Sequence, residues 1–266
     1  MPKGMIIRKT IEDYLTTEKK KNGYQFVWSP HIAKKGIYIK SKHWGKYDAM
    51  FNPMELDSDE YILKPMNCPH HFQIYLSKSR SYRELPLRIA ENATVYRNEK
   101  SGELNGLLRV RSATIDDTHT FVRNDSKYVE EELERVIKLV RKVIQDFGFK
   151  SYKARISLRD KLHLEKYIGD QKMWNVAEQA LERVVGKYNI PSFIAEGEAA
   201  FYGPKIDFMI KDAIGREWQC STIQLDFQQP LNFSMRFINE DGKEYMPAVL
   251  HIAMIGSIER FMGILI

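Results

Sequence analysis

Cysteine is scarce in this chain: its 266 residues include two, Cys68 and Cys220. Two cysteines cannot build a disulfide scaffold, and they fit a reducing compartment. No stretch stays apolar for the length that a bilayer span requires. The first ten residues, MPKGMIIRKT, contain no apolar signal segment. We therefore expect a cytoplasmic protein without a membrane partner.

Two familiar phosphate-binding loops are also missing. Neither GxGxxG nor GxxxxGK[ST] occurs at a predicted strand–helix junction, which argues against Rossmann and P-loop folds. The chain is nevertheless rich enough in apolar residues to fold, with 43% hydrophobic and 12% aromatic residues. Its net charge of +6 favours a polyanionic partner only weakly.

Hydrophobic periodicity predicts helices and strands along the whole chain. Apolar residues recur every three to four positions over 5–20, 127–147 and 171–187, which predicts amphipathic helices. Residues 152–158 and 218–227 have strand character. Strands joined by long non-helical connections, with lateral helices, predict an α+β fold on a largely antiparallel sheet.

The densest cluster of charged residues lies in 95–121, VYRNEKSGELNGLLRVRSATIDDTHTF. Two strand-like segments, 93–96 and 107–110, flank a polar turn over 99–106, which predicts a hairpin. Side chains two apart share a face of a strand, so Arg97 would lie beside Glu99, and Asp117 beside His119. Cations in such a cluster suit phosphates. The alternative is a solvated charged hairpin without a ligand.

The segment KPMNCPHH together with YRNEKSGELNGLLRVR…DDTHTF closely resembles the threonyl-tRNA synthetases, a family of class II aminoacyl-tRNA synthetases. Residues 5–30 resemble motif 1 of that class, 93–121 motif 2, and 251–266 motif 3. The resemblance implies one catalytic domain over residues 1–266, an antiparallel sheet flanked by helices, and a homodimer formed through motif 1. Editing and anticodon-binding domains have no counterpart here, so we expect an excised core rather than a natural minimal paralogue.

The resemblance implies that the chain activates L-threonine with ATP and transfers it to the 3′ end of tRNA(Thr), with Mg²⁺ bridging the phosphates. Arg97 would hold the α-phosphate and the threonine carboxylate. Lys205 would also be catalytic, and His43 would approach the terminal ribose of the tRNA. The expected ATP-binding residues are Arg97, Glu99 (adenine side), Arg109 (γ-phosphate), Gln219 and Arg260. The expected substrate-binding residues are Met66, Asp117, Tyr202, Gln219 and Ser257.

A zinc ion is the second cofactor that the resemblance implies. Members of the family hold it with one cysteine and two histidines, which correspond to Cys68, His119 and His251. Three protein ligands leave positions open for the amino and hydroxyl groups of threonine. Asp117 would accept a hydrogen bond from that hydroxyl, which rejects valine. The spacing of the three residues matches no local metal motif and gives no separate support.

Two positions depart from the family pattern. Ala113 stands where a large side chain normally packs against adenine, and Ser221 replaces a common glycine. Two other functions therefore remain open: a paralogue that adenylates another acceptor, and a non-catalytic domain that binds RNA or a partner. Ala113 favours the second of these, whereas the presence of Arg97, Arg109 and Arg260 argues against it.

Overall fold

The computed structural model describes all 266 residues, Met1–Ile266, and these form two compact units. The first unit comprises Met1–Ser77, Arg88–Thr118 and Ile255–Ile266. The second comprises Lys78–Leu87 and His119–Met254. None of the helices combines the length and the apolar character that a membrane crossing requires.

The first unit contains two sheets. In one, the strands follow the order β1, β5, β6 and β13, with β1 parallel to β5. In the other, β4 lies between β2 and β3 and is antiparallel to both. The elements are α1 (Pro2–Lys21), β1 (Gln25–Phe26), β2 (Ile32–Lys34), α2 (Gly36–Lys40), β3 (Met54–Leu56), β4 (Asp59–Leu63), α3 (Cys68–Leu76), β5 (Leu87–Tyr96), a 3₁₀ turn (Ser101–Glu103), the start of β6 (Ser112–Arg123), the end of β13 (Pro247–Ser257) and α7 (Ile258–Leu265).

The second unit is built on one mainly antiparallel sheet. Its strands follow the order β6, β13, β10, β9, β7, β8, and of the paired strands only β7 and β8 are recorded as parallel. The other elements are two 3₁₀ turns (Tyr82–Glu84 and Leu164–Lys166), α4 (Ser126–Asp146), β7 (Tyr152–Leu158), α5 (Gln171–Lys187), β8 (Ser192–Glu196), β9 (Lys205–Lys211), β10 (Glu217–Asp226), α6 (Gln228–Asn232), β11 (Phe237–Ile238) and β12 (Glu244–Tyr245). The predicted α+β class is confirmed.

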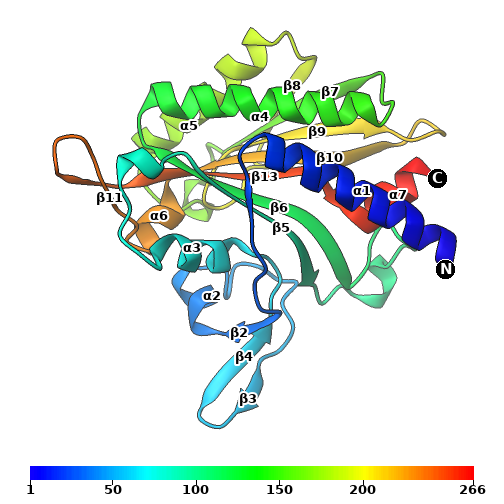
Figure 1. The fold of residues 1–266 in the computed structure, drawn as a ribbon, viewed down its shortest axis with the longest axis horizontal. Helices are drawn as coiled ribbons and strands as arrows, with labels where there is room; N and C mark the ends of the chain where they lie inside the picture. Colours follow the sequence, from blue (N-terminus) through cyan, green and yellow to red (C-terminus); the bar gives the residue numbers. More distant parts are fainter. The chain divides into compact units, whose positions relative to one another are not determined.

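Helices α4 and α5 lie together along one face of this sheet (Figure 1). Each begins at an aspartate, Asp125 or Asp170, whose side chain accepts a hydrogen bond from a backbone N–H of the first turn. The apolar stripe of α4 is buried, while ion pairs such as Arg183–Glu130 join the outer faces of the two helices. The helices predicted over 127–147 and 171–187 and the strand predicted over 152–158 are confirmed within one residue, whereas the helix predicted over 5–20 is confirmed but begins three residues earlier, at Pro2.

The predicted strand over 107–110 is wrong. These residues form a turn, closed by a bridge between Asn105 and Arg109, and β6 begins only at Ser112. The carbonyl of Leu108 accepts a hydrogen bond from Arg260 Nε at 3.0 Å. A Cβ atom added at Gly263 of α7 would lie 3.1 Å from Leu108, so the turn packs closely on this helix. Tertiary contact with α7 therefore overrides the local strand propensity.

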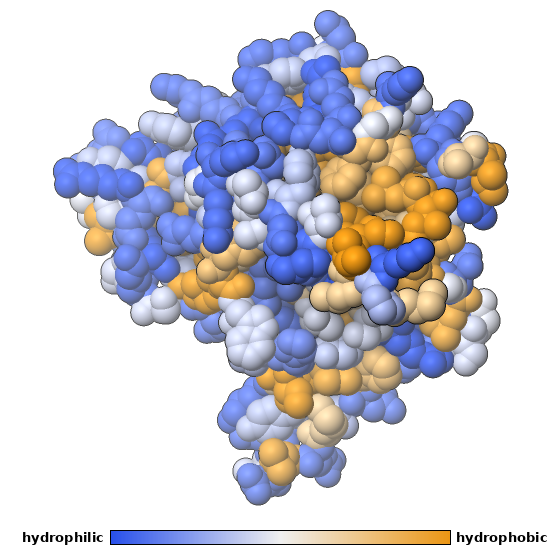
Figure 2. Space-filling model, turned by 45° about the vertical axis from the view of Figure 1, so that its right-hand side comes forward, coloured by the Kyte–Doolittle hydropathy of each residue, from blue (hydrophilic) through white to orange (hydrophobic).

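Helix α1 has an apolar surface as well as a buried side. Ile11 and Leu15 are buried, and the ammonium of Lys19 lies 3.3 Å from the buried Asp116 carboxylate. Met5 and Ile6, in contrast, are more than half exposed. Figure 2, which brings the side of α1 and α7 forward, shows a contiguous apolar area on that face. The first unit thus presents apolar side chains to solvent.

Candidate functional site

One face of the sheet in the second unit carries a patch of polar side chains. In antiparallel pairing, directly opposed residues point to the same face of the sheet. The register opposes Ser157 to Lys205, Lys205 to Gln224, and Gln224 to His251. A second row opposes Arg155 to Asp207, Asp207 to Thr222, and Thr222 to Ala253. Four neighbouring strands therefore build one polar surface.

Two of the predicted site residues meet on this surface through a buried carboxylate. Lys205 Nζ lies 2.6 Å from Asp207 Oδ2, and Gln219 Nε2 donates to Asp207 Oδ1 at 2.7 Å. The sheet places Gln219 at a β-bulge, where the register shifts between Gln219 and Ser221. Ser221 lies on the other side of that irregularity, and its hydroxyl donates to the backbone carbonyl of Met254.

The two predicted histidine ligands form a buried pair. His119 Nε2 lies 2.9 Å from His251 Nδ1, and His251 Nε2 lies 2.8 Å from Asp226 Oδ2. The backbone N–H groups of Gln228 and Gln229 donate to the other oxygen of Asp226, which holds the carboxylate in place. Tyr202, whose hydroxyl donates to Gln224 at 2.7 Å, lies with its ring 5.3 Å from the His251 ring.

This arrangement suits a metal ion. A carboxylate accepts a hydrogen bond from an imidazole N–H, so we assign the proton of His251 to Nε2, which leaves the Nδ1 lone pair directed at His119. Metal-binding histidines commonly donate their second ring N–H to a carboxylate in this way, which fixes the tautomer and orients the ring. The chemistry of the pair therefore fits the zinc that the sequence predicts. Cys68, the third predicted ligand, is buried in the first turn of α3 in the first unit.

The predicted ATP-binding residues of the first unit lie around the end of β5. The backbone of Arg97 continues the β5–β6 ladder, since its N–H donates to the carbonyl of Arg111 at 2.8 Å. The Arg97 guanidinium lies 5.7 Å from the centre of the Tyr47 ring, and its Nε donates to the carbonyl of Pro65 at 3.5 Å. This guanidinium is therefore packed on an aromatic face, which suits a cation that must hold one orientation.

Glu99 and Arg109 bind each other. Arg109 Nε and Nη2 lie 2.9 Å and 2.6 Å from the same oxygen, Glu99 Oε2, and this carboxylate is buried. Glu99 also holds Arg111, since its carbonyl accepts from Arg111 Nε at 3.0 Å. Arg260 is fixed through the Leu108 carbonyl, as described above. The structure thus holds the predicted cations of motifs 2 and 3 in the first unit through protein contacts.

Four further predicted residues lie in the first unit. His43 is buried, and its Nδ1 lies 2.8 Å from the Ser41 hydroxyl. The carbonyl of Met66 accepts from the Tyr38 hydroxyl at 3.3 Å. Asp117 is half-buried on β6. Ser257 caps α7 by accepting from the backbone N–H of Arg260 at 3.2 Å. Their predicted contacts with substrate stay predictions.

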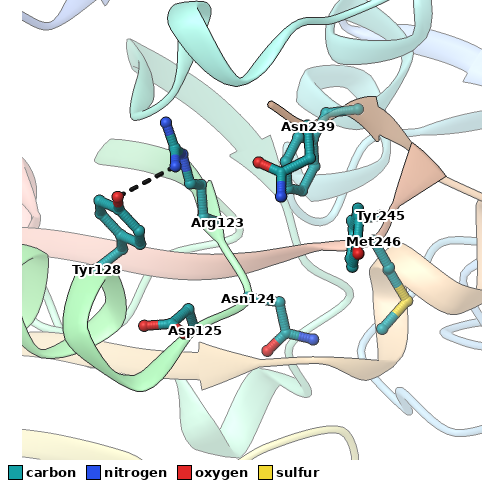
Figure 3. Close-up of a pocket in the computed structure, with 8 residues that line it drawn as sticks. Arg123, Asn124, Asp125, Tyr128, Asn239, Tyr245 and Met246 are labelled. Atoms are coloured by element: carbon teal, nitrogen blue, oxygen red, sulfur yellow. Dashed lines mark hydrogen bonds between the residues drawn. The ribbon is translucent and has the colours of Figure 1, made fainter. Parts of the chain in front are cut away.

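A cavity elsewhere in the second unit contains none of the predicted residues. It has a volume of about 360 Å³ and lies near the start of α4 (Figure 3). Its lining residues are Arg123, Asn124, Asp125, Tyr128, Phe237, Asn239, Tyr245 and Met246. Arg123 donates to the Tyr128 hydroxyl at 3.1 Å and pairs with Glu240, so protein groups already hold its guanidinium.

A family model for the tRNA synthetase class II core domain, which covers the glycine, histidine, proline, serine and threonine enzymes (G, H, P, S and T), matches residues 51–266. The chain belongs to this family. The family match covers the residues predicted as motifs 2 and 3 and begins after those predicted as motif 1.

Individual relatives narrow the likeness. The chain is 47% identical over its whole length to the threonine–tRNA ligase of Sulfurihydrogenibium sp. (strain YO3AOP1) and 46% identical to that of Bacillus velezensis. It spans 41% of the length of each. A solved structure titled the RNA binding domain of threonyl-tRNA synthetase from Cryptosporidium parvum Iowa II matches the whole chain and 65% of its own, with a TM-score of 0.93 and 33% identity.

A more distant class II structure shares the fold alone. The Giardia lamblia prolyl-tRNA synthetase, solved with prolyl-adenylate, matches with a TM-score of 0.75 at 16% identity, and the match covers 47% of that chain. Sequence reasoning missed Arg155, Asp207 and Asp226 on the polar face of this class II core. Alternating polar residues at 205 and 207, and at 222, 224 and 226, are the signal that could have found two of them.

Proposed function

We propose that this class II chain is a catalytic core that activates L-threonine with ATP and transfers the threonyl group to the 3′ end of tRNA(Thr). The named relatives support this substrate, because the 46–47% identity to threonine–tRNA ligases is found over the whole of this chain and so spans every predicted motif. The observation that carries the proposal is the buried pair of His119 and His251, backed by Asp226.

In the first step, a carboxylate oxygen of threonine attacks the α-phosphorus of ATP. The bond to the bridging oxygen of the β-phosphate breaks, and pyrophosphate leaves with the electron pair. No protein nucleophile is required, since alignment of the two reactants and neutralisation of the phosphate charge can accelerate the reaction. Arg97 would neutralise the α-phosphate, Lys205 would assist it, and Gln219 would orient the nucleotide. Arg109 and Arg260 would bind the outer phosphates and the adenosine with Mg²⁺, and Glu99 would sit on the adenine side.

Arg109 would exchange its bond to Glu99 for a phosphate. Both partners are oxygen anions that accept two N–H groups from a guanidinium, so the same planar fork serves both. The side chain of Arg109 is 45% exposed, and its outer edge is therefore open to a ligand. The Glu99 contact would hold the guanidinium near its binding position before ATP arrives.

Selection of threonine would depend on zinc and on Asp117. Cys68, His119 and His251 would hold the ion. A bound zinc ion would act as a Lewis acid that coordinates the amino and hydroxyl groups of the amino acid. Asp117 would accept the hydrogen bond of the hydroxyl, while Tyr202, Met66 and Ser257 would line the substrate site. In the transfer step, His43 would lie near the terminal ribose of the tRNA.

The test is threonine-dependent exchange of pyrophosphate into ATP, measured in parallel with serine and valine. We expect exchange with threonine, less with serine, and little with valine, since valine leaves a polar group of the site without a partner. Charging of tRNA(Thr) in a second assay separates this function from adenylation for another acceptor. Equal exchange with threonine and valine would contradict the proposed specificity.

We also propose a homodimer formed through α1. Met5 and Ile6 are 56% and 67% exposed, and an amphipathic helix with two apolar sides has one side left for a partner. Sedimentation equilibrium should give twice the chain mass of 31.2 kDa. The variant Ile6→Glu should sediment as a monomer, whereas Ile194→Glu, at a comparably exposed position of the second unit, should not change the mass. A monomeric wild-type protein would refute the dimer.

A further inference from the structure

Asp207, to which none of the predictions assigned a role, is the most highly bonded carboxylate on the polar face of the second unit. It is fully buried in the middle of β9. Side chains from three strands surround it. Its Oδ2 atom receives Arg155 Nη2 at 2.8 Å, Lys205 Nζ at 2.6 Å and Ser157 Oγ at 3.4 Å, while its Oδ1 atom receives Gln219 Nε2 at 2.7 Å and Thr222 Oγ1 at 2.9 Å.

These five donors are all side chains, and no backbone N–H is among them. The pairing of β9 with β7 and β10 is made by main-chain groups and does not need this carboxylate. A buried charge costs free energy unless partners compensate it, so an apolar residue would serve the fold better at this place. We therefore interpret the buried carboxylate of Asp207 as a group that orients the five polar side chains around it.

The contacts fix two of the predicted site residues in one orientation. Gln219 donates to Asp207 through Nε2 and accepts from Arg155 Nη2 through Oε1 at 3.1 Å, so both ends of its amide are held. The ammonium of Lys205 makes its recorded bond to Asp207 alone, and its side chain is 14% exposed. An ammonium has three N–H donors, so two of them remain for a ligand.

Two cations lie beside Asp207. Arg155 and Lys205 share this buried carboxylate, and the exposed Glu198 carboxylate lies 4.0 Å from Arg155 Nη1, so Lys205 is the cation that pairs with Asp207 alone. A flexible lysine on its own loses rotamer entropy when it is immobilised. Here the contact with Asp207 already immobilises Lys205 in the free protein, so this entropy is not lost again when substrate binds, as in other preorganised sites. The two remaining N–H groups of Lys205 then suit an anionic group, either the carboxylate of the amino acid or the phosphate of ATP.

We propose that Asp207 is a positioning residue of the activation step, which acts by holding Lys205 and Gln219 in their reactive orientation, with Arg155 as a second cation of the same site. This inference rests on the proposed function, in which Lys205 and Gln219 contact the reactants. Asp207 itself touches neither reactant.

The experiment is a double-mutant cycle in the pyrophosphate exchange assay with the 266-residue chain. Asp207→Asn should lower kcat by about 10²-fold, because a misplaced contact near the reacting atoms has an effect of that size. In a Lys205→Met background, the same change should lower kcat by a clearly smaller factor, since the ammonium that Asp207 holds is gone and its contact with Gln219 is what remains to be lost. Glu217→Gln is the matched control: it removes a carboxylate on the same sheet that pairs with Lys153 at the surface, and kcat should not change.

Multiplicative effects of Asp207→Asn and Lys205→Met would overturn the proposal, because they would show independent action. Should Asp207→Asn fail to fold, Thr222→Val tests the same cluster with its charges intact. The Thr222 hydroxyl donates to Asp207 Oδ1 and accepts from Gln219 Nε2 at 2.9 Å, and the substitution removes both hydrogen bonds. KM for ATP should rise severalfold with kcat retained, and an unchanged KM would also overturn the proposal.

A readout independent of activity separates this inference from the proposed function. Acetic anhydride labelling, followed by mass spectrometry, reports how firmly each lysine amine is held. Lys205 should be acetylated severalfold faster in Thr222→Val or Asp207→Asn than in the wild type, while labelling of Lys153 stays constant. A wild-type chain without exchange, but with this labelling pattern, refutes the proposed function and leaves Asp207 as the group that holds Lys205. Equal labelling of Lys205 in all variants refutes the inference.

Discussion

Removal of zinc should reduce threonine-dependent pyrophosphate exchange by about 10²-fold or more. The physical reason is orientation: in the proposed site, the amino and hydroxyl groups of threonine would lose their common anchor without the ion, and a misplaced reactant reacts more slowly by this factor. A chelator should therefore inactivate the chain, and added Zn²⁺ should restore exchange. His251→Ala should do the same without a chelator, because it removes a predicted ligand that Asp226 already orients.

Two matched variants distinguish loss of the ion from general damage. Asp226→Asn should retain the caps on Gln228 and Gln229 but weaken the hold on His251, with a 10–100-fold lower affinity for zinc. His163→Ala removes an exposed histidine that pairs with Asp160, and it should change neither zinc content nor exchange. Zinc content is measured by atomic absorption. Full exchange by a metal-free wild-type chain would refute the zinc site.

Replacement of Lys64 by methionine should destabilise the fold by about 3–5 kcal/mol, the usual cost of leaving one partner of a buried pair uncompensated. Lys64 is fully buried, and its Nζ lies 2.9 Å from Ser29 Oγ and 3.2 Å from Glu91 Oε1. Glu91 also accepts from the backbone N–H of Ser29 and lies 3.2 Å from His71 Nε2. Urea unfolding, followed by circular dichroism, measures the loss.

The double variant Lys64→Met/Glu91→Gln should lose less than the sum of the two single variants, since neither charge is then left alone. Lys34→Met is the control: it removes an exposed ion pair with Asp59 in the same unit, and such solvent-screened pairs contribute little to stability. Equal losses in Lys64→Met and Lys34→Met would contradict the prediction.

The pH dependence of stability tests the same pair. Burial alone raises the pKa of Glu91, but hydrogen bonds from His71 and Ser29 and the charge of Lys64 outweigh it and lower this pKa to about 2. A carboxyl whose pKa is lower in the folded state contributes stability above its unfolded value, about 4.5. That contribution is lost as the pH falls from about 4.5 towards 2. The stability gap between the wild type and Glu91→Gln should therefore narrow over this range.

Local sequence determined most of the regular structure. The helices over 126–146 and 171–187 have a strong 3.6-residue pattern and aspartate caps, so neighbours in the chain suffice to specify them. Strand 152–158 likewise alternates clearly. The motifs around Arg97 and Arg260 indicated the class II family, which the comparisons confirm. Each of these signals is contained within a short window of residues.

Tertiary structure decided the features that depend on residues far apart in the chain. Residues 107–110 read as a strand by themselves, yet contact with α7 makes them a turn, because one hydrogen bond from Arg260 and close packing at Gly263 outweigh a weak strand propensity. The bond of Asp226 to His251 depends on the register of two strands, and the five donors of Asp207 come from three. Strand register is set by the pairing of distant segments, so no local pattern could determine which polar side chains meet.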